Sequence, residues 1–177
     1  MKKDLLTHFG FLLGFFALIT LFKGRFELAF IPFWIGGIIG TLLPDVDHLL
    51  YVYFFRPQET TSQKVTTLIA DNKYKESWDM MASTRLQRTN LIFHTSSFQV
   101  AFLVFAFLVI TSTISLVAKG TVIAFVLHLI VDQLVDYIET KSYDSWFTRF
   151  PIILTEIQKK WYLVGNVVIL LVFGFLF

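Results

Sequence analysis

Long apolar runs constrain the fold of this chain more than any other sequence feature. A segment in the hydrocarbon core of a bilayer must satisfy its own backbone hydrogen bonds, so it crosses as a helix of about 20 residues or as part of a closed barrel. The 177-residue sequence holds four or five such runs, at 5–22, 28–54, 91–117, 120–140 and 161–177. With a hydrophobic fraction of 55%, the chain is predicted to be an all-α, polytopic integral membrane protein with four to five transmembrane helices.

The segments around these runs complete the predicted organisation. The first run resembles a signal peptide, but it is too long, and Lys-Gly-Arg follows it at 23–25 where small cleavage-site residues belong, so we expect a retained span. Residues 56–90 form one long polar loop, and residues 143–157 are predicted to be an interfacial segment. The sequence therefore predicts a single transmembrane domain over 1–177.

The basic residues predict how the chain is oriented. Twelve of the fifteen lysines and arginines fall at the N-terminus, in the loop 56–90 or in the segment 141–160, and the other three are Lys23, Arg25 and Lys119. Cytoplasmic segments carry the excess of Lys and Arg. We therefore expect a multi-pass protein of the plasma membrane with its N-terminus and the 56–90 loop in the cytoplasm.

Ionisable side chains interrupt the apolar runs, and this topology brings them to the cytoplasmic half of the bilayer. They are His8 in the first run, Asp45, Asp47 and His48 in the second, His94 in the third, and His128, Asp132 and Asp136 in the fourth. A charged group at mid-membrane costs on the order of 2.5–3.5 kcal/mol. We therefore expect these side chains to share a compensating partner.

The fourth run carries the deepest of these residues. His128 and Asp132 are four residues apart and share a helix face, which Asp136 continues. At 1.5 Å per residue, His128 lies roughly 15 Å or more from the inner end of its helix. A tilted helix or a sloping cavity is needed to bring it to the other histidines.

The second run carries three ionisable residues within four positions. Asp45 and His48 are three apart and share a helix face, so they are the likelier metal ligands of the three. Asp47 points elsewhere unless Pro44, which is able to kink the helix, breaks it.

Imidazoles and carboxylates without thiolates are ligands for a hard or borderline divalent cation. The chain has no cysteine, so Zn²⁺, Mn²⁺ or Fe²⁺ would be held by nitrogen and oxygen alone. We expect one or two ions, with zinc as the first choice; the alternative is a charge-paired network without metal. The candidate metal ligands are His8, Asp45, His48, His94, His128 and Asp132.

The order of these motifs resembles a known family. Residues 43–48, LPDVDH, resemble the LPDxDH signature of the LexA-regulated, inner-membrane, metal-dependent hydrolases of the YdjM-like family. His8 is similar to that family's early histidine, residues 94–96 to the end of its HRGxTHS motif, and His128 with Asp132 to its HxxxD motif. Where the family has His-Arg-Gly, this chain reads Thr-Asn-Leu-Ile-Phe at 89–93. The resemblance implies metal-dependent hydrolysis in a bacterial inner membrane.

The leading functional hypothesis is a membrane-embedded metal-dependent hydrolase. We expect a phosphoesterase that acts on a lipid or lipid-linked substrate from the cytoplasmic leaflet, and no nucleic-acid partner. Asp47, or another carboxylate without a metal, is the candidate general base, and Arg85 and Arg88 are candidates for holding a phosphate oxygen.

Two other functions use the same residues. A cation or proton transporter or channel would use the His/Asp cluster as a binding site or relay, but it needs a path to both membrane faces, and the ionisable residues lie in one half. A bis-histidine haem protein would leave the carboxylates unexplained. The sequence argues against a zinc protease of the HExxH type, because that motif is absent.

Overall fold

The described part of the chain is helical. The computed structural model describes residues 2–88, 91–113 and 115–177, and no strand occurs among them. Four helical stretches in these ranges are long and apolar enough to cross a membrane: Asp4–Lys23, Leu28–Phe55, Leu116–Thr140 and Glu156–Leu176. They correspond to the first, second, fourth and fifth predicted runs. The prediction of an all-α, polytopic membrane protein is confirmed.

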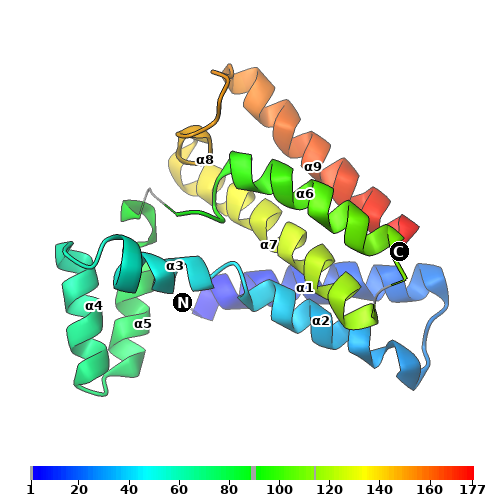
Figure 1. Ribbon diagram of the computed structural model, residues 1–177, viewed down its shortest axis with the longest axis horizontal. Helices are drawn as coiled ribbons and strands as arrows, with labels where there is room; N and C mark the ends of the chain where they lie inside the picture. Colours follow the sequence, from blue (N-terminus) through cyan, green and yellow to red (C-terminus); the bar gives the residue numbers. More distant parts are fainter. Residues whose placement is uncertain (1, 89–90, 114) are drawn as a thin grey trace.

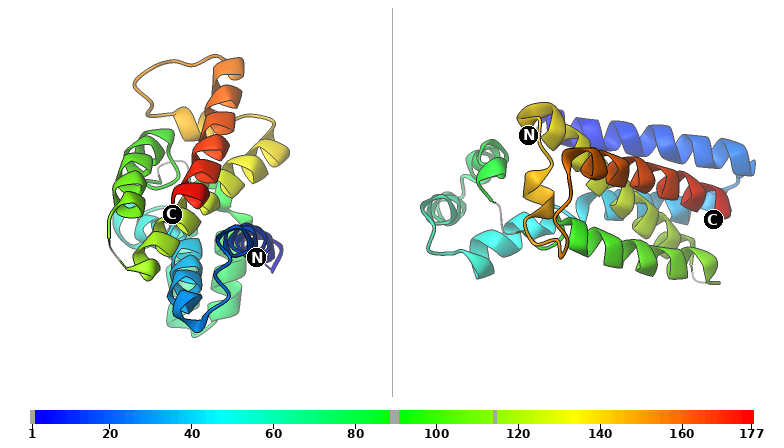
Figure 2. Two further views of the ribbon diagram at one scale, coloured as in Figure 1. Left: turned by 90° about the vertical axis from the view of Figure 1, so that its right-hand side faces the viewer. Right: turned by 90° about the horizontal axis from the view of Figure 1, so that it is seen from above.

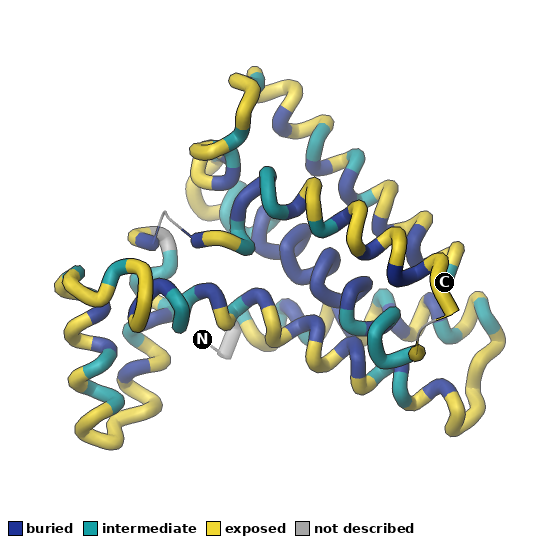
Figure 3. The backbone as a smooth tube through the Cα atoms, viewed as in Figure 1, coloured by how far each residue is buried: buried dark blue, intermediate teal, exposed yellow. Residues whose placement is uncertain are grey.

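Helix α7 (Leu116–Thr140) forms the centre of the bundle. Helices α1 (Lys2–Lys23), α2 (Ile31–Leu42), α6 (Ser96–Thr111) and α9 (Glu156–Leu176) all pack against it (Figure 1). It is the most buried of the four candidate spans, and the buried part of the backbone in Figure 3 follows its length. Side chains on α7 therefore meet neighbours from every other long helix.

Glycines bring α2 and α7 into backbone contact. A Cβ atom on Gly40 would lie 2.1 Å from the carbonyl oxygen of Thr121, and one on Gly120 would lie 2.1 Å from that of Phe33. These separations are far inside van der Waals contact, so no larger residue fits without moving a helix. The close approach sets the C-terminal end of α2 against the middle of α7.

The second predicted span is broken at Pro44. Helix α3 (Val46–Leu50) follows α2 after a turn in which Val46 N–H donates to the Leu43 carbonyl (3.2 Å), and a π-helical turn over Tyr51–Phe55 ends the stretch. Proline has no N–H to donate and its ring disfavours a continuous helix. The break leaves the last carbonyls of α2 without partners from their own helix.

The third predicted span is shorter than expected. The sequence predicts 91–117, but α6 covers only 16 residues and the segment before it is not helical. Thr95 is the N-cap of α6, and its hydroxyl accepts a hydrogen bond from Phe98 N–H (3.3 Å). A threonine hydroxyl that accepts from a backbone N–H of the first turn stabilises the start of a helix at that residue. His94 therefore precedes α6 instead of lying one turn inside it.

The polar loop 56–90 contains a helical hairpin. Helices α4 (Thr60–Ala70) and α5 (Tyr74–Ser83) are joined by a turn in which Asn72 has a φ of 60°, and a 3₁₀ turn over Arg85–Gln87 follows. The hairpin packs on the end of the second span through its own small apolar cluster, which is built on Val52, Val65 and Met81. It projects from one end of the bundle (Figures 1 and 2).

The predicted interfacial segment 143–157 is mostly irregular. It holds one short helix, α8 (Asp144–Phe147), in which Trp146 is buried. Helix α9 begins at Glu156, because Thr155 and Gln158 form a capping box that satisfies its first N–H groups. Helix α8 returns the chain to the end of α7, beside the site described next.

Candidate metal centre

All four histidines of the chain come together at one end of the bundle. The rings of His8 and His128 stack with centroids 4.1 Å apart, and the centroids of His48 and His94 are 5.1 Å apart. His94 and His128 connect the two pairs, at 6.1 Å. The expectation that residues from four segments share one site agrees with this geometry, including His128, the deepest of them.

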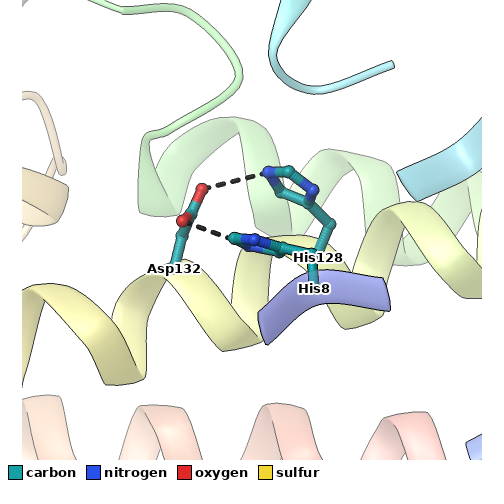
Figure 4. Close-up of side chains that lie close together, drawn as sticks. All are labelled: His8, His128 and Asp132. Carbon is teal, nitrogen blue, oxygen red and sulfur yellow. Dashed lines mark ion pairs between the residues drawn. The ribbon is translucent and has the colours of Figure 1, made fainter. Parts of the chain in front are cut away.

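Asp132 lies where three of these rings meet. Its Oδ1 atom is 3.3 Å from His8 Nε2, and its Oδ2 atom is 3.1 Å from His128 Nε2 (Figure 4). Oδ2 is also 3.0 Å from His94 Nε2. Only 3% of Asp132 and 2% of His128 is exposed. A carboxylate is thus buried among three ring nitrogens.

Backbone carbonyls fix which nitrogen of His8 and His128 carries the proton. Nδ1 of His8 is 2.9 Å from the Asp4 carbonyl oxygen. Nδ1 of His128 is 2.7 Å from the carbonyl oxygen of Thr41, one of the groups left free where α2 ends. A carbonyl only accepts hydrogen bonds, so Nδ1 is the donor in each ring and the neutral ring has its lone pair on Nε2.

The two Nε2 atoms therefore aim lone pairs at carboxylate oxygens. Both are buried and have no hydrogen-bond partner among the described residues. Lone pairs that face one another in a buried site need a positive charge between them, either protons on the rings or a bound cation. His8, His128 and Asp132 each offer a ligand atom within 4.8 Å of the others. This buried group could hold a metal ion.

Asp47 holds His94 in place. It is fully buried, and its Oδ2 atom accepts from the backbone N–H of Phe93 (2.6 Å) and lies 3.3 Å from His94 Nδ1. The sequence predicts that Asp47 points away from Asp45 and His48 unless Pro44 breaks the helix. The helix is broken there, and Asp47 is the most buried of these three residues. Its contacts are those of a carboxylate that orients a histidine.

Asp45, the N-cap residue of α3, and His48 within that helix border the centre. Together with His94 they form a second group of potential ligands within 4.8 Å, and Asp45 Oδ1 is 3.7 Å from His128 Nε2. His48 differs from the other three histidines because its Nδ1 atom accepts from Arg88 Nε at 3.1 Å. In the neutral ring the proton is then on Nε2.

Arg85 joins the centre through carboxylates. Its Nη1 atom donates to Asp132 Oδ1 (2.9 Å) and its Nη2 atom to Asp136 Oδ1 (2.6 Å). Burial opposes the charge of this guanidinium, but Asp132 and Asp136 outweigh that effect and raise the pKa of Arg85. Arg85 is therefore a fixed positive charge beside Asp132.

Arg88 joins the centre through His48. It also donates to the Thr84 hydroxyl (2.9 Å) and to the carbonyl of Met81. Burial lowers the pKa of Arg88 to about 10, so the group is still charged at neutral pH. The structure thus places both predicted phosphate-binding arginines at the site, where each is bound to protein acceptors.

Trp146 is a member of the site that the sequence did not single out. Its indole N–H donates to Asp136 Oδ2 (2.7 Å), and its ring lies 5.8 Å from that of His94. Asp136 is therefore held by Trp146 and Arg85 together. Nothing in the local sequence signals this contact, because it depends on α8 folding back on the end of α7.

Two cavities border the centre. The first, of about 80 Å³, is lined by polar residues of the site and by apolar side chains from α1, α3 and α5. The second, of about 50 Å³, is lined by five residues that the first cavity does not contact: Leu91, His94, Asp136, Ser145 and Trp146. The two share His48, Arg85, Arg88 and Asp132 as a common wall.

Comparisons with known proteins do not add to this geometry: no family model, curated protein or solved structure matches the chain. The likeness of residues 43–48 to the LPDxDH signature stays a prediction.

Proposed function

We propose that the chain is a membrane-embedded, metal-dependent hydrolase that cleaves a phosphoester of a lipid or lipid-linked substrate at the cytoplasmic leaflet. One observation carries the proposal. Three imidazoles, of which those of His8 and His128 are buried, are each held at Nδ1 by an oxygen atom, and each directs Nε2 at Asp132. A metal-bound histidine characteristically donates its other N–H to a carbonyl or carboxylate in this way.

Zinc fits the donor set best. His8, His128 and Asp132 supply two nitrogens and one oxygen, and catalytic zinc sites hold the ion with three protein ligands and keep a fourth position open. Asp45 and His94, from the second group of potential ligands, would hold a second ion; His48, the third member of that group, has its Nδ1 lone pair on Arg88 and is left out. A divalent cation bound here supplies a water of pKa near 7 and a Lewis acid for the phosphoryl oxygen.

The remaining residues have roles set by their contacts. Hydrolysis forms a bond between a water oxygen and phosphorus, breaks the ester P–O bond and returns a proton to the leaving alcohol. With a single ion in the first group, Asp45 holds no metal; it lines the first cavity with its side chain partly accessible, so its carboxylate is placed to take the proton of the attacking water. Asp47, the predicted general base, is assigned instead to holding His94, because its Oδ2 atom is engaged there and the residue is fully buried and lines neither cavity.

The two arginines suit a phosphate-containing substrate. Guanidinium groups bind phosphate oxygens through charge-assisted hydrogen bonds. Arg85 and Arg88 line both cavities at the centre. A phosphoryl group bound in either cavity would lie beside these two guanidinium groups.

Metal content is the first test. Purified wild-type protein should contain about one or two equivalents of zinc by mass spectrometry, and His128→Ala should lose most of it. Asp71→Asn is the matched control, because Asp71 is an exposed carboxylate on the hairpin turn. Wild-type protein without any divalent metal, or full retention by His128→Ala, would overturn the proposal.

Turnover is the second test. Zinc-loaded protein in vesicles should release inorganic phosphate from a lipid phosphate, and His128→Ala should abolish the release. If metal-loaded protein carries ions across the vesicle membrane and releases no phosphate, the transporter function replaces the hydrolase.

A further inference from the structure

The first cavity has two chemically different walls. One wall is polar and belongs to the centre, with His8, Asp45, Arg85 and Arg88. The other is apolar, with Leu5 from α1, Leu49 from α3, and Trp78 and Met81 from α5. The second cavity has no comparable apolar wall, because Leu91 and Trp146 are its apolar residues and Trp146 points its N–H at Asp136.

The apolar wall opens to the surface at two residues. Leu5 is 39% exposed and Trp78 is 41% exposed, whereas Met81 is buried. Leu5 is near the beginning of a candidate span, so this side of the opening adjoins the boundary between hydrocarbon and water. Tryptophan is enriched at that boundary, where its ring contacts apolar chains and its N–H contacts water.

The size of the cavity limits what it encloses. Its volume of about 80 Å³ is several times the space that one water molecule needs, but well below the roughly 300–1,000 Å³ of a pocket that surrounds a drug-sized ligand. A phosphoryl head group therefore fits inside, and an acyl or isoprenoid chain has to stay outside and pass through the opening.

We infer that this cavity is the head-group subsite for a phosphomonoester lipid, whose chain leaves between Leu5 and Trp78. Two guanidinium groups on the polar wall favour a dianionic phosphate with several acceptor oxygens. The inference rests on the proposed function for the identity of the substrate. Beyond that function, it specifies which of the two cavities receives the head group and which side chains contact the apolar chain of the lipid.

Thiol labelling tests the subsite without requiring activity. The chain has no cysteine, so Trp78→Cys introduces a single thiol at the opening. In phosphatidylcholine vesicles this thiol should react with a membrane-permeant maleimide, and phosphatidic acid at about 10 mol% should slow the reaction at least fivefold. Phosphatidylglycerol, which is anionic but has no phosphomonoester, and inorganic phosphate should each have less than a twofold effect.

Trp161→Cys is the matched control for the labelling. Trp161 is an exposed tryptophan on α9 and does not line the cavity. Its labelling rate should not depend on phosphatidic acid. Equal slowing at both positions, equal slowing by phosphatidylglycerol, or no slowing at Trp78→Cys would overturn the subsite.

Kinetics separate this inference from the proposed function. Trp78→Ala should raise KM for phosphatidic acid about tenfold and change kcat less than twofold, whereas Trp161→Ala should change neither constant. Protection of Trp78→Cys by phosphatidic acid in a protein that does not hydrolyse phosphatidic acid would retain the subsite and refute the hydrolase. Hydrolysis of phosphatidic acid without any protection would retain the hydrolase and refute the subsite.

Discussion

The hydrogen bonds at Nδ1 distinguish the histidines of the centre from one another. His8, His94 and His128 are each held by an oxygen that accepts, whereas His48 faces the donor Arg88. The sequence places His48 among the likelier ligands, because it shares a helix face with Asp45. Spacing along a helix does not report which ring atom a distant arginine contacts, so this difference is visible only in the folded chain.

Asp47 supports a prediction about metal affinity. Asp47→Asn keeps an oxygen for the Phe93 N–H but removes the charge beside His94 Nδ1. Residues that orient a metal ligand typically contribute 10–100-fold to affinity, so we expect zinc to bind about 10–100-fold more weakly by isothermal titration. Asp71→Asn should bind zinc as the wild type does. Unchanged affinity in Asp47→Asn would contradict the orienting role.

Arg85 supports a prediction about stability. In Arg85→Ala the buried carboxylate of Asp132 loses its cationic partner, and breaking a buried pair of this kind costs about 3 kcal/mol. We expect a lower unfolding temperature for metal-free Arg85→Ala by tryptophan fluorescence in detergent. Zinc should restore more stability in this variant than in the wild type, because the ion supplies the missing positive charge.

Arg88→Ala provides the comparison. Arg88 contacts His48, Thr84 and Met81 but none of the carboxylates at the centre. Its loss should lower stability without enlarging the stabilisation by zinc. Equal zinc responses in the two arginine variants would show that Arg85 does not act through Asp132.

At the scale of the elements, local signals account for the helices and long-range contacts account for the site. The apolar runs and the i, i+4 spacing of His128 and Asp132 are readable from the sequence, because they depend on one segment at a time. The position of His94 is not readable in this way. His94 precedes α6, which begins after the N-cap Thr95, and its place is fixed by a contact with Asp47, 47 residues away in the chain.

The packing of α2 on α7 determines whether Thr41 reaches His128. Gly40→Ala places a methyl group 2.1 Å from a backbone oxygen of α7, and overpacking of this kind typically costs 1–3 kcal/mol. We expect a lower unfolding temperature together with weaker zinc binding, because the Thr41 carbonyl moves away from His128 Nδ1.

Gly10→Ala is the matched control for this helix contact. A Cβ atom on Gly10 meets nothing within 4 Å, and alanine favours a helix interior by about 0.5–1 kcal/mol over glycine. This variant should be as stable as the wild type or slightly more stable. Comparable losses in both variants would mean that the glycines of α2 have no special role in packing.

At the scale of the whole molecule, the histidines and the carboxylates near them are gathered at one end of the bundle. The hairpin of α4 and α5, the start of α1 and the end of α7 all meet at the His/Asp centre (Figures 1 and 2). Beyond it, α2 and α7 are in backbone contact and the interior is filled by apolar side chains. The proposed hydrolase needs a centre of this kind, because its substrate enters from one face of the membrane.

The orientation of that end is a prediction from the basic residues, and single cysteines test it. In intact cells, a membrane-impermeant maleimide should label Phe26→Cys, in the exposed turn after α1, and should not label Asp71→Cys, on the hairpin. Permeabilised cells should show both variants labelled, since both positions are exposed. The reverse pattern in intact cells would place the centre at the outer face, and its lipid substrate would then have to come from the outer leaflet.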